Sequence, residues 1–194
     1  MSQSFLPQHL LAPGSLTASI DEAGNPLVKR SIVYWRSLKG ERRFPAREAL
    51  SLRGMAAFLR YTIIVHVLDR AADYEFTYVG DAQREAFQSY FKGLRVSQLQ
   101  AAAPEFGNVL RGVYDVIRAN GAPFIVRGRT GTEPVDSKSA YFESAFLPLG
   151  ASDVAVDHIL VVGVRIPEPF WNLSEDDRKT LAAQSETRRS ASGK

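Results

Sequence analysis

The stretch that most limits how this chain folds runs from Tyr141 to Ile166. Two runs rich in apolar and β-branched residues flank a Gly-Ala-Ser-Asp segment at positions 150–153. Apolar runs on either side of a short polar turn are typical of a β-hairpin. The second run, Val154 to Ile166, is almost entirely apolar, so we expect it to be the central strand of a sheet.

The composition sets the broad class of the protein. The 194 residues are enough for one domain with tails, and none of them is cysteine, which excludes disulfides, cysteine–zinc sites and thiol catalysis. The first basic residue is Lys29, and no apolar run approaches the roughly 18 residues of a membrane span. We therefore expect a soluble, cytoplasmic protein.

Basic residues are concentrated near the N-terminus. The segment from Val28 to Arg60 holds nine basic and two acidic residues, a net charge of +7, whereas the whole chain carries only +3. Such asymmetry can attract nucleic acid, nucleotides or an acidic protein partner. A solvated helical face explains it equally simply, and we favour that interpretation.

The sequence divides into four segments. Residues 1–26 have no clear period and predict a mobile arm, and residues 27–60 predict two flanking helices, 27–38 and 47–60. Residues 61–166 predict the folded core. Residues 167–194 predict a polar C-terminal helix followed by a disordered basic tail.

Within the core, the periodicity predicts five strands and two helices. In chain order they are a strand at 61–68, a strand at 74–80, a helix at 82–91, a helix at 104–119, a strand at 124–129 and the closing hairpin. A short turn is expected through Leu99. The fold class is α+β, with a five-stranded antiparallel sheet, helices packed on one face, and the first strand beside the central one.

This element order is that of a PAS domain, and several motifs strengthen the likeness. They are Tyr34 to Gly40 followed by Pro45-Ala46-Arg47, Tyr74 to Gly80, Gly121-x-Pro123, Leu147-Pro148-Leu149, and Val156 to Leu160. Together they resemble a family of small, single-domain bacterial PAS-like proteins over Leu27 to Ile166. The chain departs from that family at Thr77, where an arginine is frequent, and at Asp81, where a threonine is frequent.

The resemblance implies a sensory or adaptor module in bacterial signalling. Such a module acts through contacts with a signalling protein partner, with or without a small-molecule ligand. The apolar edge of Ile32, Trp35 and Leu38 can be buried on the chain's own sheet or against a second copy. PAS domains commonly associate through flanking helices, so we favour the homodimer interface. The helix that carries this edge is the candidate output element.

The sequence identifies no cofactor. A photoactive flavin needs a cysteine for its adduct, and a haem PAS domain needs an axial histidine, but no histidine lies between His66 and His158. No metal-ligand spacing and no phosphate-binding glycine motif appears. We therefore expect neither haem nor photoactive flavin.

Five side chains are candidates for a ligand pocket between the sheet and the helices. They are Phe76, Tyr78, Tyr114, Phe146 and His158, of which the tyrosines and the histidine would supply polar contacts. The simpler interpretation of the aromatic residues is plain core.

Two other classes of function stay open. An enzyme on a cupped sheet would need Asp157, Glu143 or His158 as its acid or base, and we assign none of them as catalytic. Asp157 and His158 are adjacent in a predicted strand, so we expect them on opposite faces and not as a dyad. Nucleic-acid binding through the basic segment ranks last, because no aromatic residues alternate with basic ones on a strand face.

Overall fold

The computed structural model describes residues 15–68, 72–87, 92–130 and 140–166. The strands are β1 (Ser15–Ala18), β2 (Thr62–Leu68), β3 (Asp73–Val79), β4 (Phe124–Thr130), β5 (Ala140–Leu149) and β6 (His158–Ile166). The helices are α1 (Pro26–Lys39), α2 (Leu52–Met55), α3 (Asp81–Phe87), α4 (Val96–Ala102) and α5 (Pro104–Asn120), with short 3-10 turns η2 (Ile20–Glu22), η3 (Arg47–Ala49) and η4 (Leu59–Tyr61). No helix within these described ranges has the length and apolar character needed to cross a membrane.

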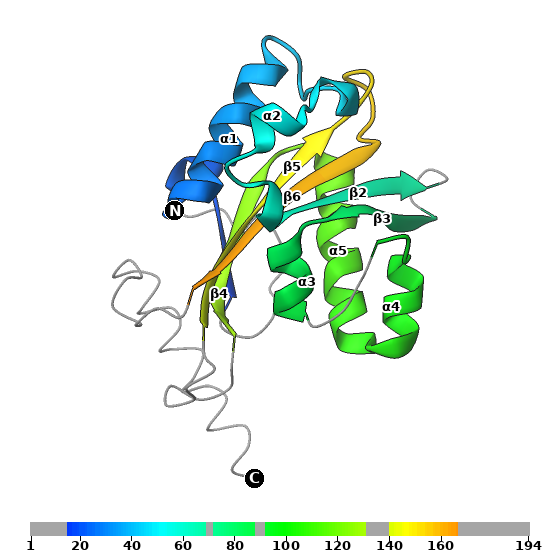
Figure 1. Cartoon of the computed structure of the whole chain (residues 1–194). Coiled ribbons are helices and arrows are strands. Elements are labelled where there is room, and N and C mark those ends of the chain that lie inside the picture. The colour runs from blue at the N-terminus through cyan, green and yellow to red at the C-terminus, as the bar shows by residue number, and fades with distance from the viewer. Residues whose placement is uncertain (1–14, 69–71, 88–91, 131–139, 167–194) are drawn as a thin grey trace.

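The six strands form one antiparallel sheet in the order β1-β4-β5-β6-β2-β3 (Figure 1). The strand β6 pairs with β5 along its whole length and with β2 on its other side. This confirms the prediction that the apolar run ending at Ile166 is central and lies beside the first strand of the core. Strands β2 to β6 thus make the five-stranded antiparallel sheet that we expected, in an α+β fold.

A sixth strand, β1, lies where the sequence predicted a mobile arm. It pairs with the edge of β4, from Ser15 opposite Gly128 to Ala18 opposite Ile125. Its four residues are too few to show an alternation of apolar and polar side chains in the sequence. The segment forms a strand because β4 offers a free edge for pairing. The start of the predicted arm and the predicted C-terminal helix lie outside the described residues.

The predicted helix from Arg47 to Arg60 is wrong, because the segment forms η3, α2 and η4 instead. The Ser51 side chain caps α2 by accepting a hydrogen bond from the Gly54 N–H at 3.1 Å. A Cβ atom at Gly54 would lie 2.4 Å from the ring of Tyr34, so the chain passes this ring only because residue 54 has no side chain. The helix α4 was missed because its N-cap residue, Arg95, is not of a type that usually caps helices.

Different parts of the chain cover the two faces of the sheet. Successive side chains of a strand point to opposite faces. On β5, Phe146 contacts Tyr114 of α5, and we call this the inner face. Glu143, an odd number of residues away, contacts the chain just before α1, and we call its side the outer face. Accordingly α1 and α5 lie on opposite sides of the sheet (Figure 1).

Cap and stop residues define both ends of α1. The Asn25 side chain accepts hydrogen bonds from the N–H groups of Leu27 at 2.9 Å and Val28 at 3.4 Å. Pro26 occupies the first turn, and Gly40 ends the helix with a φ of 51°. The helix packs on the outer face over β5 and β6.

Candidate functional site

Three of the five predicted pocket residues meet on the inner face. The ring centroid of Tyr114 lies 6.5 Å from that of Phe76 and 6.3 Å from that of Phe146. Phe146 also stacks on Phe124 at 5.4 Å, and Tyr74 lies 5.3 Å from Tyr114. All five side chains are buried, and burial raises the pKa of Tyr114 well above its ordinary value, with Tyr74 adding to the shift. The predicted pocket is therefore filled by aromatic rings in contact.

The other two predicted pocket residues do not join this cluster. Tyr78 is paired with Ile64 on the outer face, where its hydroxyl group donates to the carbonyl of Leu59 at 3.4 Å. His158 also lies on the outer face and stacks against His66. Strand register, which the sequence alone did not reveal, separates these residues from the inner cluster.

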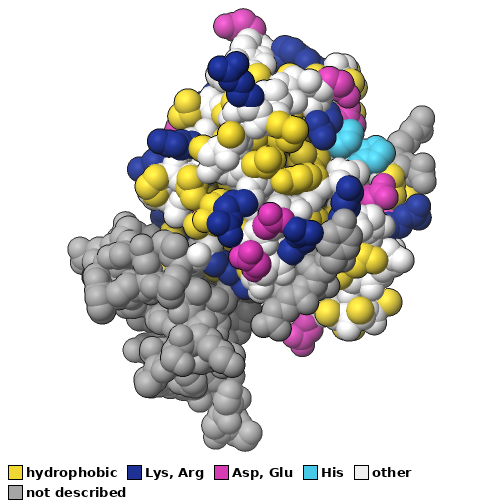
Figure 2. Space-filling model, viewed as in Figure 1, with side chains coloured by type: hydrophobic (Ala, Val, Ile, Leu, Met, Phe, Trp, Pro, Cys, Tyr) yellow, Lys and Arg dark blue, Asp and Glu magenta, His cyan; other side chains and the backbone are white. Residues whose placement is uncertain are grey.

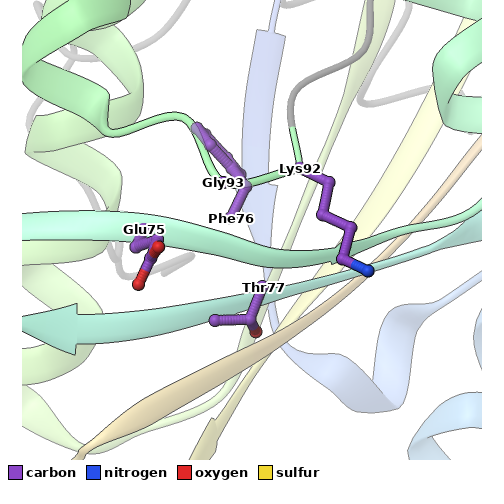
Figure 3. Close-up of a pocket in the computed structure, with 5 residues that line it drawn as sticks. All are labelled: Glu75, Phe76, Thr77, Lys92 and Gly93. Carbon is purple, nitrogen blue, oxygen red and sulfur yellow. The ribbon is translucent and has the colours of Figure 1, made fainter.

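An open depression lies beside the edge strand β3 (Figure 3). It has a volume of about 420 Å³. It is lined by Glu75, Phe76, Thr77, Lys92 and Gly93. The Glu75 and Lys92 side chains lie towards its two ends, with Thr77 between them (Figure 3). Of the predicted pocket residues only Phe76 contributes, so this depression is not the predicted pocket.

A buried carboxylate on the outer face fixes the start of α1. Glu143 is fully buried, and its two oxygens accept hydrogen bonds from the N–H groups of Gly24 at 2.9 Å and Asn25 at 2.9 Å. The Tyr141 hydroxyl group donates to the same carboxylate at 3.2 Å. We call these contacts the Glu143 latch, because they fix the segment from which α1 begins.

The predicted dimer interface is buried against the chain's own sheet. Ile32 is 3% exposed and Trp35 is 2% exposed, whereas Leu38 is partly buried. The indole N–H of Trp35 donates to the carbonyl of Pro148 at 2.8 Å. This corrects the assignment of Ile32 and Trp35 to a surface between two copies, because the apolar outer face of β5 and β6 already covers them.

A different surface is apolar and open. Val33 is 66% exposed and Leu52 is 69% exposed, although both are large hydrophobic residues. The helices that carry them pack side by side, since the Tyr34 hydroxyl group accepts a hydrogen bond from the Ser51 N–H at 2.9 Å. We define the α1–α2 surface as the exposed residues Lys29, Arg30, Val33, Leu52, Arg53 and Ala56. Figure 2 shows hydrophobic side chains on this side of the molecule, with basic side chains around them.

Six of the nine basic residues between Val28 and Arg60 fall into two groups. Arg36, Arg42 and Arg60 form ion pairs with Asp21, Asp153 and Glu85, at distances between 2.6 and 3.4 Å. Lys29, Arg30 and Arg53 form no ion pair with any described residue. The α1–α2 surface is therefore apolar at its centre and carries uncompensated positive charge.

The expectation that Asp157 and His158 cannot interact is wrong. Asp157 Oδ1 lies 2.8 Å from Nδ1 of His158. The strand β6 begins at His158, so Asp157 lies in the loop before it, where strict alternation of faces does not apply. The second oxygen of Asp157 accepts a hydrogen bond from the Ala151 N–H at 2.8 Å, which holds the carboxylate in place.

Comparisons with known proteins give no family assignment. No protein-family model matches the chain, and no curated protein matches it. Among solved structures, an RNA-binding Light-Oxygen-Voltage receptor is similar, with 14% sequence identity and a TM-score of 0.43. The match covers 93% of this chain and 44% of the receptor's chain, so the chain spans less than half of that protein. RNA binding and light reception are properties of that receptor, and at this level of similarity neither is carried over.

Proposed function

We propose that this protein is a PAS-type adaptor in bacterial signalling that acts by binding a protein partner at the α1–α2 surface. One observation supports the proposal: the inner face, where a small ligand would bind, is filled by aromatic rings, whereas Val33 and Leu52 are exposed on α1 and α2. Large exposed apolar groups rimmed by polar ones are typical of protein interaction sites.

The charge of the surface favours an acidic partner segment with apolar anchors. Lys29, Arg30 and Arg53 would steer such a segment and sit at the rim, while Val33 and Leu52 receive its apolar side chains. Nucleic acid fits less well, because the aromatic side chains of α1 point away from solvent. Trp35 is buried in the core, and Tyr34 packs against Phe58 at 5.8 Å.

The same helix connects the surface to the sheet. A partner that binds α1 differently in its docked and released states shifts the equilibrium between these states, and this differential affinity is what a signal requires. The contacts that would break on release of α1 are the Glu143 latch and the Trp35–Pro148 hydrogen bond. The output element proposed here is therefore α1 itself.

Site-specific crosslinking tests the proposal. A photoreactive benzoyl-phenylalanine in place of Leu52 should capture a protein in cells, whereas the same group in place of Val154, which is 87% exposed, should not. The captured partner should then bind the double variant Val33→Asp, Leu52→Asp at least tenfold more weakly than the wild type. Val154→Asp is the matched control and should leave the affinity unchanged. Equal capture at both positions, or an unaltered affinity of the double variant, would contradict the proposal.

A small-molecule sensor is the second candidate, and the depression beside β3 is the observation that favours it. Its opposed carboxylate and ammonium groups would suit a small zwitterionic ligand. Native mass spectrometry of the purified protein distinguishes the two functions. A retained mass that disappears in the variant Thr77→Arg would favour sensing over a purely adaptor role.

A further inference from the structure

Two histidines that are far apart in the sequence lie directly opposite one another on the outer face. His66 of β2 is paired with His158 of β6. The neighbouring pair is the hydrogen-bonded one, since the Val67 N–H donates to the carbonyl of Asp157 at 2.9 Å. The histidines therefore form a non-hydrogen-bonded pair, in which side chains approach most closely.

The two imidazole rings are close and accessible. Their centroids are 4.6 Å apart and their planes differ by 13°. Both residues are partly exposed, the side chain of His158 by 21%, and Figure 2 shows histidine side chains at the molecular surface. Solutes can therefore reach the pair.

Asp157 defines which nitrogen of His158 is free. Its contact with Nδ1 favours the proton on that atom, which leaves the lone pair of Nε2 available to a ligand. The Ala151 N–H fixes the other carboxylate oxygen. A carboxylate that orients an imidazole from behind is the usual support of a metal-binding histidine.

The separation of the rings suits a shared ion. An imidazole nitrogen binds zinc at about 2.0–2.1 Å, so two nitrogens on one ion are at most about 4.2 Å apart. The ring centroids lie 4.6 Å apart and the rings are nearly parallel, so each ring must tilt out of the stacked arrangement before the two in-plane lone pairs converge on one ion. Imidazole is a preferred ligand of late first-row divalent ions, with Cu²⁺ bound most tightly.

We infer that His66 and His158 bind a divalent transition-metal ion, with Asp157 as a positioning residue. No three acidic or histidine side chains of the described residues are close enough together to hold an ion. The protein thus supplies two ligands and water completes the coordination, so the site is open and exchangeable. This inference is independent of the adaptor proposal.

Calorimetric titration with CuCl₂, NiCl₂ and ZnCl₂ tests the site. The reference is the full chain with His9→Ala, so that His66 and His158 are its only histidines. One ion per chain is expected, with Cu²⁺ bound most tightly. His66→Gln and His158→Gln should each weaken binding at least tenfold, and Asp157→Asn roughly tenfold. Glu48→Gln, an exposed acidic position, should change nothing.

A second readout needs no variant at the site. In the folded reference protein, substoichiometric Cu²⁺ should broaden the ring proton signals of both histidines together, before backbone signals of the inner face are affected. The inference is overturned if the histidine variants bind as tightly as the reference. Broadening spread evenly over the protein, or no binding at millimolar metal, would overturn it as well.

Discussion

The inner and outer faces of the sheet are both largely covered, yet they are closed in different ways. The inner face is closed by ring-to-ring packing between the sheet and α5, as in the contact of Phe146 with Tyr114. The outer face is closed by α1, which is attached through directed polar contacts at Glu143 and Trp35. Ring packing resists opening over its whole area, whereas α1 combines apolar packing at Ile32 and Trp35 with polar contacts that single substitutions can remove. The difference predicts that substitutions at the polar contacts loosen α1 without disturbing the inner face.

The largest expected effect comes from Trp35→Ala. Removing a buried indole ring and its hydrogen bond should lower the free energy of unfolding by about 3–5 kcal/mol, as measured by chemical denaturation. Val33→Ala, on the exposed side of the same helix, should change it by about 0.5 kcal/mol or less. If Trp35→Ala instead turned a dimer into a stable monomer, the packing of α1 on its own sheet would be contradicted.

The next effect concerns the Glu143 latch. Glu143→Gln replaces one carboxylate oxygen with an N–H donor that faces the N–H groups of Gly24 and Asn25. We expect a loss of about 1.5–3 kcal/mol, with faster amide hydrogen exchange at the start of α1 than in α5. Glu48→Gln serves as the exposed control. Equal acceleration in both helices would show that the two faces do not open separately.

A smaller effect concerns how two aspartates, Asp73 and Asp21, contribute to the pH dependence of the unfolding free energy. Asp73 is partly buried, which alone would raise its pKa, but hydrogen bonds from Ser97 and from the Tyr74 N–H outweigh burial and lower the pKa. A carboxyl group with a lowered pKa in the folded state stabilises the protein above its unfolded pKa of about 3.9, and this stabilisation is lost as the pH falls through the lower folded value.

We therefore expect Asp73→Asn to flatten the acid limb of a plot of unfolding free energy against pH, by roughly 1 kcal/mol or less. The pKa of Asp21 is also lowered, by its hydrogen bond and ion pair with Arg36, but this pair is exposed to solvent. Asp21→Asn should leave the acid limb unchanged, particularly at high salt. A larger change for Asp21 than for Asp73 would contradict this ranking.

The smallest expected effect on stability is that of Leu52→Asp. Because Leu52 is 69% exposed, its replacement should change the unfolding free energy by about 0.5 kcal/mol or less. Circular dichroism and denaturation of the variant provide the measurement. A marked destabilisation would mean that Leu52 packs against the chain itself, and the α1–α2 surface would lose its apolar anchor.

The sequence predicted the architecture well where the pattern was local. The pairing of β2 with β3 and the central position of β6 both follow from periodicity and from turn residues. Features that depend on long-range contacts were missed. The strand β1 exists only because β4 has a free edge, and the chain turns at Gly54 because the Tyr34 ring lies there.

The candidate site was harder to predict than the fold. Ile32 and Trp35 were correctly identified as an apolar stripe, but a stripe does not reveal which surface covers it. Phe76, Tyr114 and Phe146 were correctly grouped, whereas Tyr78 and His158 were misplaced because their face depends on register. The pairing of His66 with His158 has no local signal in the sequence and appears only once β6 lies beside β2.

The central position of β6 also affects how the protein is synthesised. The hairpin β2–β3 is complete at Val79, but its neighbour β6 ends at Ile166, so 87 further residues must be added first. At a synthesis rate of roughly 5–20 residues per second, the apolar edge of β2 stays unpaired for about 4–17 s before β6 is complete. Throughout that interval Ile63, Ile64 and Val65 present an unpaired strand edge of the kind that binds other chains. The strand that completes the sheet is therefore also the one whose late arrival exposes the nascent chain to aggregation.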